Sequence, residues 1–241
     1  MIELRDVSFA YDGVPALSHV DMRIRRGEAV AFIGPIGSGK STLLKLVNGI
    51  VLPDTGSYFL AGEEITRKRL KESGFSRRMQ QRIGFLFQNV DAQLFCPVVY
   101  DEVAFGPRQL GLDDAAVDER VKDCLRLLGI DHLARRAPHH LSEGEKRSVA
   151  LASVLALNPE VLTLDEPMNG LDPRTKRLMR EVILSLSAAG KTILCSTHDF
   201  AYVEDLFSRA VVISRDHAVA RDGEYRSILG DRAFLSDLNI V

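Results

Sequence analysis

The chain contains 241 residues, of which 46% are hydrophobic and 27% are charged, so it has enough apolar chain to bury a sizeable core. This composition excludes a disulfide-stapled miniprotein, a collagen-like chain and a wholly disordered chain. The formal net charge of -2 gives no electrostatic reason to expect a nucleic acid as partner, and we predict none.

The sequence carries no signal for export or for membrane insertion. The segment MIELRDVSF already contains the acidic residues Glu3 and Asp6 and lacks the apolar run of a secretory signal. The longest uncharged stretch, residues 148–159, is well short of the roughly 20 apolar residues that a membrane helix needs. The 3 cysteines form no C-x-x-C pair, which argues against disulfides and structural zinc. We therefore expect a cytoplasmic protein.

Hydrophobic patterning predicts several strands in the first third of the chain. Residues 20–24 alternate apolar and polar side chains, and residues 2–9 are expected to pair with them. Residues 29–33 are a continuous apolar run, typical of a strand buried on both faces. Further strands are predicted at residues 58–61, after a turn at Asp54-Thr55-Gly56, and at residues 83–87.

Helical periodicity begins after Gln88. Residues 113–128 place apolar side chains on one helical face, and a second apolar helix is predicted over residues 142–157. Buried strands return at residues 161–164 and 192–195, with Asp172-Pro173 between them as an N-cap followed by proline. The alternation of strand and helix indicates a parallel sheet with crossover helices.

Two segments give weaker signals. The basic stretch between Arg67 and Arg82 fits an anionic-lipid or nucleic-acid patch, but its polar surroundings favour an ordinary solvated face. Residues 214–241 are mixed in charge and poorly periodic, with a helix predicted only near residues 227–230.

The motif GPIGSGKS, residues 34–41, fits G-x-x-x-x-G-K-[ST] and lies between a buried strand and an apolar helix. Its glycines let backbone amides turn toward a phosphate at a helix N-terminus. Lys40 adds a charge for the β- and γ-phosphate oxygens, and Ser41 offers a hydroxyl to magnesium. This pattern predicts a nucleotide-binding loop rather than a merely glycine-rich turn.

Polar residues follow three predicted strands. The motif VLTLDEP ends a strand with two carboxylates, of which Asp165 suits magnesium and Glu166 suits the polarisation of an attacking water. His198 and Gln88 also come just after strands, where ligands of such folds bind. Each of these residues alone is a weak signal; together with a phosphate loop they predict a catalytic centre.

The segment LSEGEKRSVALA opens a helix with a capping box, because Ser142 is followed three residues later by Glu145. A well-capped helix is the plain interpretation. The functional one is a helix N-terminus aimed at a phosphate. Because the phosphate loop already has its own helix, this second terminus is best used on a neighbouring subunit's nucleotide.

In chain order, GPIGSGKS, FQN, LSEGE, VLTLDEP, GLDP and STHD resemble the motifs of the ABC ATPases over nearly the whole chain. The resemblance implies an α/β P-loop NTPase fold with a mostly parallel central sheet, an N-terminal antiparallel β subdomain and an inserted helical subdomain. It also implies a head-to-tail homodimer, in which ATP lies between the Walker motifs of one subunit and the signature motif of the other.

The same resemblance implies a single nucleotide-binding domain with three parts. Residues 1–88 and 158–213 form the RecA-like core with its β subdomain, residues 89–157 form the helical subdomain, and residues 214–241 form a short tail.

By motif position, the resemblance also implies roles for individual residues. Gln88 is the Q-loop, Asp172 the D-loop, Glu166 the catalytic base and His198 the switch histidine at the γ-phosphate. The implied magnesium ligands are Ser41, Gln88 and Asp165. Tyr11 is expected to stack on adenine. The other residues expected to bind ATP, in one subunit or its partner, are Gly34, Pro35, Ile36, Gly37, Ser38, Gly39, Lys40, Ser41, Thr42, Ser142, Gly144, Glu145 and Asp172.

Within the superfamily, residues 88–112 and the segment PHHLSEGEKR are similar to the energy-coupling-factor (ECF) importers, and most of all to cobalt-transport ATPases of the CbiO type. This likeness implies docking to a CbiQ-like transmembrane T component and a CbiM-like S component that captures cobalt or nickel ions, at the cytoplasmic face of the membrane. A vitamin importer of the same branch and a soluble ABC ATPase remain alternatives.

The sequence departs from the family pattern in three motifs. Glu143 stands where the signature usually has its first glycine, Ile36 replaces the commoner asparagine, and Met168-Asn169 replaces the usual threonine-containing pair. A carboxylate at Glu143 either weakens ATP-driven closure or points outward with little effect.

Overall fold

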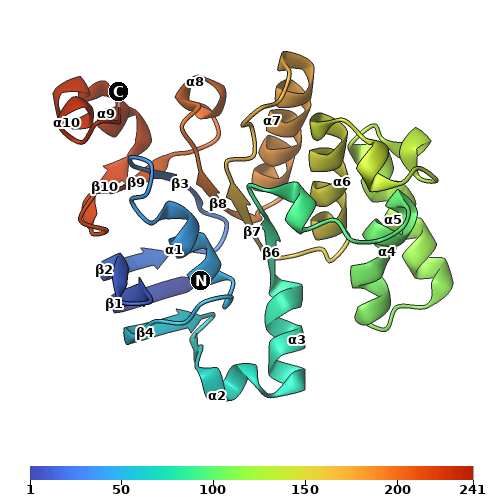
Figure 1. Ribbon diagram of the computed structural model, residues 1–241, viewed down its shortest axis with the longest axis horizontal. Helices are drawn as coiled ribbons and strands as arrows, with labels where there is room; N and C mark the ends of the chain where they lie inside the picture. Colours follow the sequence, from blue (N-terminus) through green and yellow to red (C-terminus); the bar gives the residue numbers. More distant parts are fainter. Residues whose placement is uncertain (241) are drawn as a thin grey trace.

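Two sheets form the framework of the computed structural model, which describes residues 1–240 (Figure 1). A four-stranded antiparallel sheet has the order β2-β1-β4-β5, and a six-stranded sheet has the order β10-β9-β3-β8-β7-β6. Within the larger sheet, β9, β3, β8, β7 and β6 run parallel and β10 pairs antiparallel with β9. The strands are β1 (Ile2–Tyr11), β2 (Val14–Ile24), β3 (Ala29–Ile33), β4 (Thr55–Leu60), β5 (Glu63–Glu64), β6 (Ile83–Leu86), β7 (Val161–Asp165), β8 (Thr192–Ser196), β9 (Arg209–Ile213) and β10 (Val219–Glu224).

This architecture confirms the predicted fold class. The first two strands pair antiparallel, with Ile2 opposite Ile24, and β3 is buried along its whole length. The predicted turn before residue 58 was wrong in part, because β4 begins at Thr55, which pairs with Ser8 of β1. Gly56 has φ 81° and lies so close to the backbone of Asp6 that a side chain would not fit.

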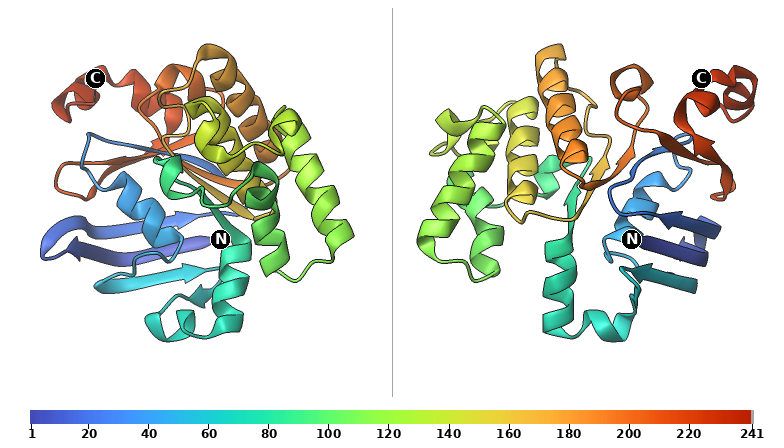
Figure 2. Two further views of the ribbon diagram at one scale, coloured as in Figure 1. Left: turned by 45° about the vertical axis from the view of Figure 1, so that its right-hand side comes forward. Right: turned by 180° about the vertical axis from the view of Figure 1, so that it is seen from behind.

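Helices cover the six-stranded sheet, and some of them lie beyond it on one side. Figures 1 and 2 show α4 and α5 beyond α6, on the side away from the four-stranded sheet. Three single-turn 3₁₀ helices, η1 (Val90–Ala92), η2 (Asp131–Leu133) and η3 (Pro138–His140), connect elements in this region. The α-helices are α1 (Lys40–Val47), α2 (Arg67–Leu70), α3 (Ser73–Arg82), α4 (Val99–Gln109), α5 (Asp114–Leu127), α6 (Glu143–Leu155), α7 (Pro173–Ala188), α8 (Phe200–Val203), α9 (Tyr225–Gly230) and α10 (Arg232–Asp237).

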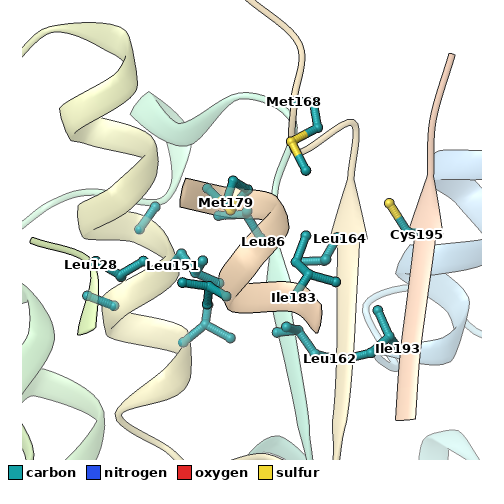
Figure 3. Packing of buried hydrophobic residues seen from close by; sticks show 14 of the residues in the cluster. Leu86, Leu128, Leu151, Leu162, Leu164, Met168, Met179, Ile183, Ile193 and Cys195 are labelled. Atoms are coloured by element: carbon teal, nitrogen blue, oxygen red, sulfur yellow. The ribbon is translucent and has the colours of Figure 1, made fainter. Parts of the chain in front are cut away.

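The central strands separate two hydrophobic cores. Along β3, Ala31 and Ile33 belong to one core, and Val30 and Phe32 belong to the other, as the two-residue period of a strand requires. Figure 3 shows the first core, where side chains of α6 and α7 meet those of β6, β7 and β8. The second core lies among β3, α1 and the antiparallel sheet. A strand buried on both faces accounts for the continuous apolar run at residues 29–33.

The basic stretch folds into α2 and α3, which the sequence pattern did not predict. Phe75 and Met79, four residues apart on α3, are buried, and most charged side chains around them are exposed. Arg82 contacts Glu160 at 3.0 Å. Because only these two apolar residues face the core and the other faces are polar, the helix shows little apolar periodicity in the sequence.

The C-terminal segment is more structured than its sequence suggested. The helix predicted near residues 227–230 is part of α9, and its side chains Tyr225 and Ile228 are buried in the first core. The sequence pattern did not predict β10 or α10. As an edge strand, β10 alternates half-buried and exposed residues and so lacks the apolar run of a central strand.

A search of residues 1–240 finds no helix with the length and apolar character needed to cross a bilayer.

Candidate active site

The phosphate loop connects β3 to α1 and depends on glycine at several points. Gly37 has φ 81° and Gly39 has φ 108°, a region in which residues with side chains are strained. A side chain at Gly34 would collide with the carbonyl oxygen of Ile213, and one at Gly39 with that of Ala16. The loop is therefore held closely between β9 and β2.

Lys40 folds back over this loop. Its Nζ donates to the carbonyl oxygens of Gly34 at 2.7 Å and Pro35 at 2.9 Å, and the residue is 7% exposed. Burial lowers the pKa of Lys40, and the carboxylates of Glu166 and Asp165 oppose this shift. A cation held only by loop carbonyls is well placed to bind an anion in the loop.

The remaining loop residues divide into buried and exposed ones. Ser38 is 1% exposed, and its Oγ has no hydrogen-bond partner. An orphaned buried hydroxyl inside a phosphate loop fits a site built to receive another polar group. Thr42 is buried in the first turn of α1, whereas Ile36 is 93% exposed at the tip of the loop.

Asp165, at the end of β7, meets the start of α1 and the end of β8. Its Oδ1 accepts hydrogen bonds from Ser41 Oγ at 3.0 Å and Ser196 Oγ at 2.6 Å. The carboxylate is 4% exposed. A phosphate-loop hydroxyl and a carboxylate at the end of a strand hold Mg²⁺ in phosphate-loop NTPases, so the pair Ser41 and Asp165 fits a magnesium ion.

Glu166 and His198 face each other across the ends of β7 and β8. Glu166 Oε1 lies 3.3 Å from His198 Nε2, and Glu166 Oε2 accepts from the backbone N–H of His198 at 3.2 Å. Burial raises the pKa of Glu166. Burial, together with the charge of Lys40, lowers the pKa of His198 and so favours the neutral imidazole. A poised carboxylate beside a neutral imidazole suits proton transfer.

The backbone of Glu166 is strained. Its φ is 49°, which is uncommon for a residue with a side chain. Its N–H donates to Ser196 Oγ at 3.0 Å and to the Ser196 carbonyl oxygen at 3.2 Å. Such strain persists only where surrounding contacts fix it, and it gathers at functional sites.

Gln88 is exposed, and the structure connects it to the site through its backbone. The carbonyl oxygen of Gln88 accepts from Arg147 Nη2 at 3.0 Å, and Arg147 Nη1 donates to the Glu166 carbonyl oxygen at 2.8 Å. Sequence reasoning missed Arg147. The available signal was a cationic residue inside the apolar helix predicted over residues 142–157, and Arg147 is only 6% exposed.

The LSEGE residues form a second group at the starts of α6 and α7. Ser142 and Glu145 form the predicted capping box, with Ser142 N–H donating to Glu145 Oε2 at 2.7 Å. The hydrogen bond from the Ser142 hydroxyl to Glu145 Oε2, together with the bond from the Ser142 N–H, holds the pKa of Glu145 below its usual range. Gly144 lies against Thr175 of α7, where a Cβ would meet Oγ1 at 3.3 Å. Asp172 caps α7 by accepting from the N–H of Thr175 at 3.2 Å.

This second group is separate from the phosphate loop. A cavity of about 660 Å³ is lined by Gly144, Glu145 and Asp172, and none of residues 34–42 lines it. Glu143 next to it is exposed and lies 3.5 Å from Lys146 Nζ. Tyr11, at the end of β1, is 41% exposed and packs edge to face on Phe9. The predicted site residues therefore fall into a catalytic cluster, a helix-start cluster and a lone aromatic.

Among residues 1–240 there is no group of three or more His, Cys, Asp and Glu side chains arranged to hold a metal ion.

Comparison with known proteins gives the same family throughout. Residues 17–169 match the family model described as ABC transporter. A protein of Clostridium acetobutylicum assigned to the ABC transporter ATP-binding proteins is 54% identical over 241 residues and covers 100% of both chains. The nickel import ATP-binding protein LarO of Lactiplantibacillus plantarum is 44% identical over 222 residues, covering 92% of this chain and 92% of LarO.

The fold has a solved counterpart as well. The structure of CbiO1 from Clostridium perfringens, described as part of the ABC transporter complex CbiONQ, superposes with a TM-score of 0.82. It is 33% identical to this chain, and the match covers 99% of this chain and 94% of CbiO1.

Proposed function

The chain belongs to the ABC transporter family, and from that membership we propose that it powers an ECF-type importer of cobalt or nickel ions. It is an ATPase that binds and hydrolyses ATP. The observation that carries the proposal is the junction of the phosphate loop with Asp165, Glu166 and His198 at one edge of the parallel sheet.

The catalytic cluster supports a separate role for each group: phosphate binding, magnesium binding and proton transfer. The amides of the phosphate loop and Lys40 bind the β- and γ-phosphates, which the unpaired Ser38 hydroxyl and the tight glycine turn favour. Ser41, Asp165 and the side chain of Gln88 are the proposed magnesium ligands, and a bound magnesium ion neutralises charge on the phosphates. Glu166 accepts the proton of the attacking water, and His198 contacts the γ-phosphate.

The helix-start cluster supports a head-to-tail homodimer. Ser142, Gly144, Glu145 and Asp172 gather at the starts of α6 and α7, outside the chain's own phosphate loop. A helix N-terminus favours an anion, and the N-terminus of α6 binds the nucleotide held by the phosphate loop of a second copy. On this account Tyr11 stacks on the adenine, and turnover rises faster than linearly with protein concentration.

A groove between α3 and α4 supports a membrane partner. It encloses about 660 Å³ and is lined by Arg77 and Gln81 of α3, Phe105 of α4, and Phe87 after β6. Phe95 and Phe105 are 66% and 43% exposed, and their rings meet edge to face at 4.9 Å. Exposed aromatic anchors beside a groove suit an amphipathic helix. We assign this groove to a cytoplasmic coupling helix of a CbiQ-like T component.

The groove also supports the proposed organisation and location. Residues 89–157 act as the helical subdomain that receives the partner, and residues 1–88 with 158–213 act as the core. The chain then lies at the cytoplasmic face of the membrane, held there by its partners. A CbiM-like S component captures the metal ion, which the ATPase itself never touches. The similarity to LarO, which is named a nickel import protein, supports a transition-metal ion as cargo.

The test is transport by the reconstituted importer. Proteoliposomes containing the chain and its membrane components should accumulate radioactive Ni²⁺ or Co²⁺ when ATP and Mg²⁺ are supplied on the ATPase side. Glu166→Gln should assemble normally and abolish this accumulation. Wild-type vesicles that hydrolyse ATP and accumulate a vitamin instead of either ion would contradict the metal assignment.

A further inference from the structure

One buried arginine joins three elements of the catalytic region. Arg147 of α6 donates from Nη1 to the carbonyl oxygen of Glu166, after β7, and from Nη2 to the carbonyl oxygen of Gln88, after β6. The two distances are 2.8 Å and 3.0 Å. A planar guanidinium presents its donors in a fixed geometry, so it sets the spacing of these two carbonyls more rigidly than a flexible ammonium would.

The peptide of Glu166 is held on both sides. Ser196 accepts its N–H, and its carbonyl oxygen accepts from Arg147 and from the backbone N–H of Asn169 at 3.1 Å. Because φ at Glu166 is 49°, this backbone conformation relies on such contacts. The carboxylate of Glu166 follows its backbone, so Arg147 helps to set where the base points.

The Gln88 side of the contact belongs to a loop that α6 holds firmly. Lys146 Nζ donates to Asp91 Oδ1 at 2.7 Å, and Gln93 Nε2 donates to the Ala150 carbonyl oxygen at 3.1 Å. The side-chain oxygen of Gln93 also accepts from the N–H of Phe87 at 3.1 Å. Phe87 and Gln93 line the groove between α3 and α4. Residues of α6 therefore contact both the loop that lines the groove and the carbonyl oxygen of Glu166.

We propose that Arg147 is a positioning residue that fixes the Glu166 carboxylate for proton transfer and ties it to the loop lining the groove. The inference rests on the proposed function, because it takes Glu166 as the catalytic base. Arg147 does not touch the reacting atoms. Its effect therefore falls on the chemical step and leaves ATP binding unchanged.

The experiment compares Arg147→Met, Arg147→Lys and a matched control, Arg120→Met. Arg120 is half-buried and donates from Nη1 to the Ala156 carbonyl oxygen at 3.1 Å, so its loss also removes an arginine–carbonyl bond. For each purified chain, kcat and KM for ATP, the affinity for a fluorescent ATP analogue and the thermal midpoint are measured, with activity assayed well below every midpoint.

The expected pattern separates positioning from folding. A displacement near 1 Å at a catalytic group costs about 100-fold, so Arg147→Met should lower kcat by about 10- to 100-fold with KM changed less than about 3-fold. Arg147→Lys should recover part of kcat because one charge-assisted bond remains. The nucleotide affinity of both variants should match wild type, and Arg120→Met should keep kcat within about 2-fold while its midpoint falls.

Three results would overturn the inference. If Arg147→Met keeps wild-type kcat, or lowers kcat only as far as Arg120→Met does, Arg147 serves folding alone. If kcat is equally low in Arg147→Lys and Arg147→Met and nucleotide affinity is lost in both, Arg147 belongs to ATP binding. Glu166→Gln, measured in parallel, tests the catalytic base separately. Wild-type turnover of Glu166→Gln would exclude Glu166 as the base and, with it, the positioning role of Arg147. Lost turnover of Glu166→Gln together with full activity of Arg147→Met would exclude only the positioning role.

Discussion

Glu102 provides a quantitative test, because its buried carboxylate organises the loop that carries Phe95. The residue is 3% exposed, and its Oε2 accepts from the backbone N–H groups of Phe95 at 2.9 Å and Cys96 at 2.7 Å. Hydrogen bonds to an ionised group contribute about 1.5–3 kcal/mol each. Because the two donors share one oxygen and are only partly buried, we take the lower value for each and expect Glu102→Ala to lower the free energy of unfolding by about 3 kcal/mol.

The predicted loss is large enough to separate from background. At about 2–4 °C per kcal/mol for a domain of this size, Glu102→Ala should melt about 6–12 °C below wild type. Urea unfolding followed by circular dichroism measures the same quantity independently. Glu102→Gln keeps an acceptor oxygen without the charge and should lose about half as much.

The neighbouring Asp101→Ala is the control. Asp101 forms an exposed ion pair with Arg108 at 3.1 Å, and such pairs contribute about 0–1 kcal/mol. If the free energies of unfolding of Glu102→Ala and Asp101→Ala lie within about 0.5 kcal/mol of each other, the Glu102 carboxylate does not stabilise the loop at Phe95. Because Glu102 also fixes the loop at Phe95, Glu102→Ala should in addition weaken capture of the membrane component.

Three further variants test the catalytic cluster and the helix-start cluster. Lys40→Ala should fail in ATP binding or in the chemical step, and normal activity there would contradict the phosphate-loop assignment. Glu166→Gln should bind ATP and lose about 100- to 10,000-fold in turnover, and wild-type turnover would exclude Glu166 as the base. Because burial raises the pKa of Glu166, its ionised carboxylate lowers native stability above the native pKa, and this penalty is absent below the pKa of the unfolded chain. Glu166→Gln should therefore melt above wild type at neutral pH and level with it in acid; a lower midpoint at neutral pH contradicts the burial argument. Glu143→Gly should tighten the proposed ATP-dependent dimer, because it removes a carboxylate close to where the partner's triphosphate would lie. The gain in affinity should be only about 1.5- to 5-fold, since Glu143 is exposed and already lies near Lys146. Unchanged dimer affinity by ultracentrifugation would contradict this prediction.

The fold was predictable where local patterning and tertiary environment agree. The apolar runs at residues 29–33 and 161–164 became buried parallel strands because both faces of these strands are covered. The capping box at Ser142 and the Asp172 N-cap formed as predicted, since both depend on residues within one turn.

Predictions failed where a segment depends on distant partners. The helix α3 has only Phe75 and Met79 on its buried face, and β10 is an edge strand whose charged residues hide its pairing with β9. The role of Arg147 depends on two carbonyls from strands far apart in the sequence. No pattern within a single segment reports such a contact.

Mixing two inactive variants tests whether each ATP site is shared between two subunits. Lys40→Ala disables the phosphate loop, and Gly144→Asp places a carboxylate at the start of α6, beside Thr175. In a head-to-tail dimer, one mixed site combines the intact phosphate loop of one subunit with the intact α6 start of the other. A shared head-to-tail site predicts that ATP hydrolysis, absent from each variant alone, returns in part on mixing. Two folded variants that stay inactive together would contradict the shared site.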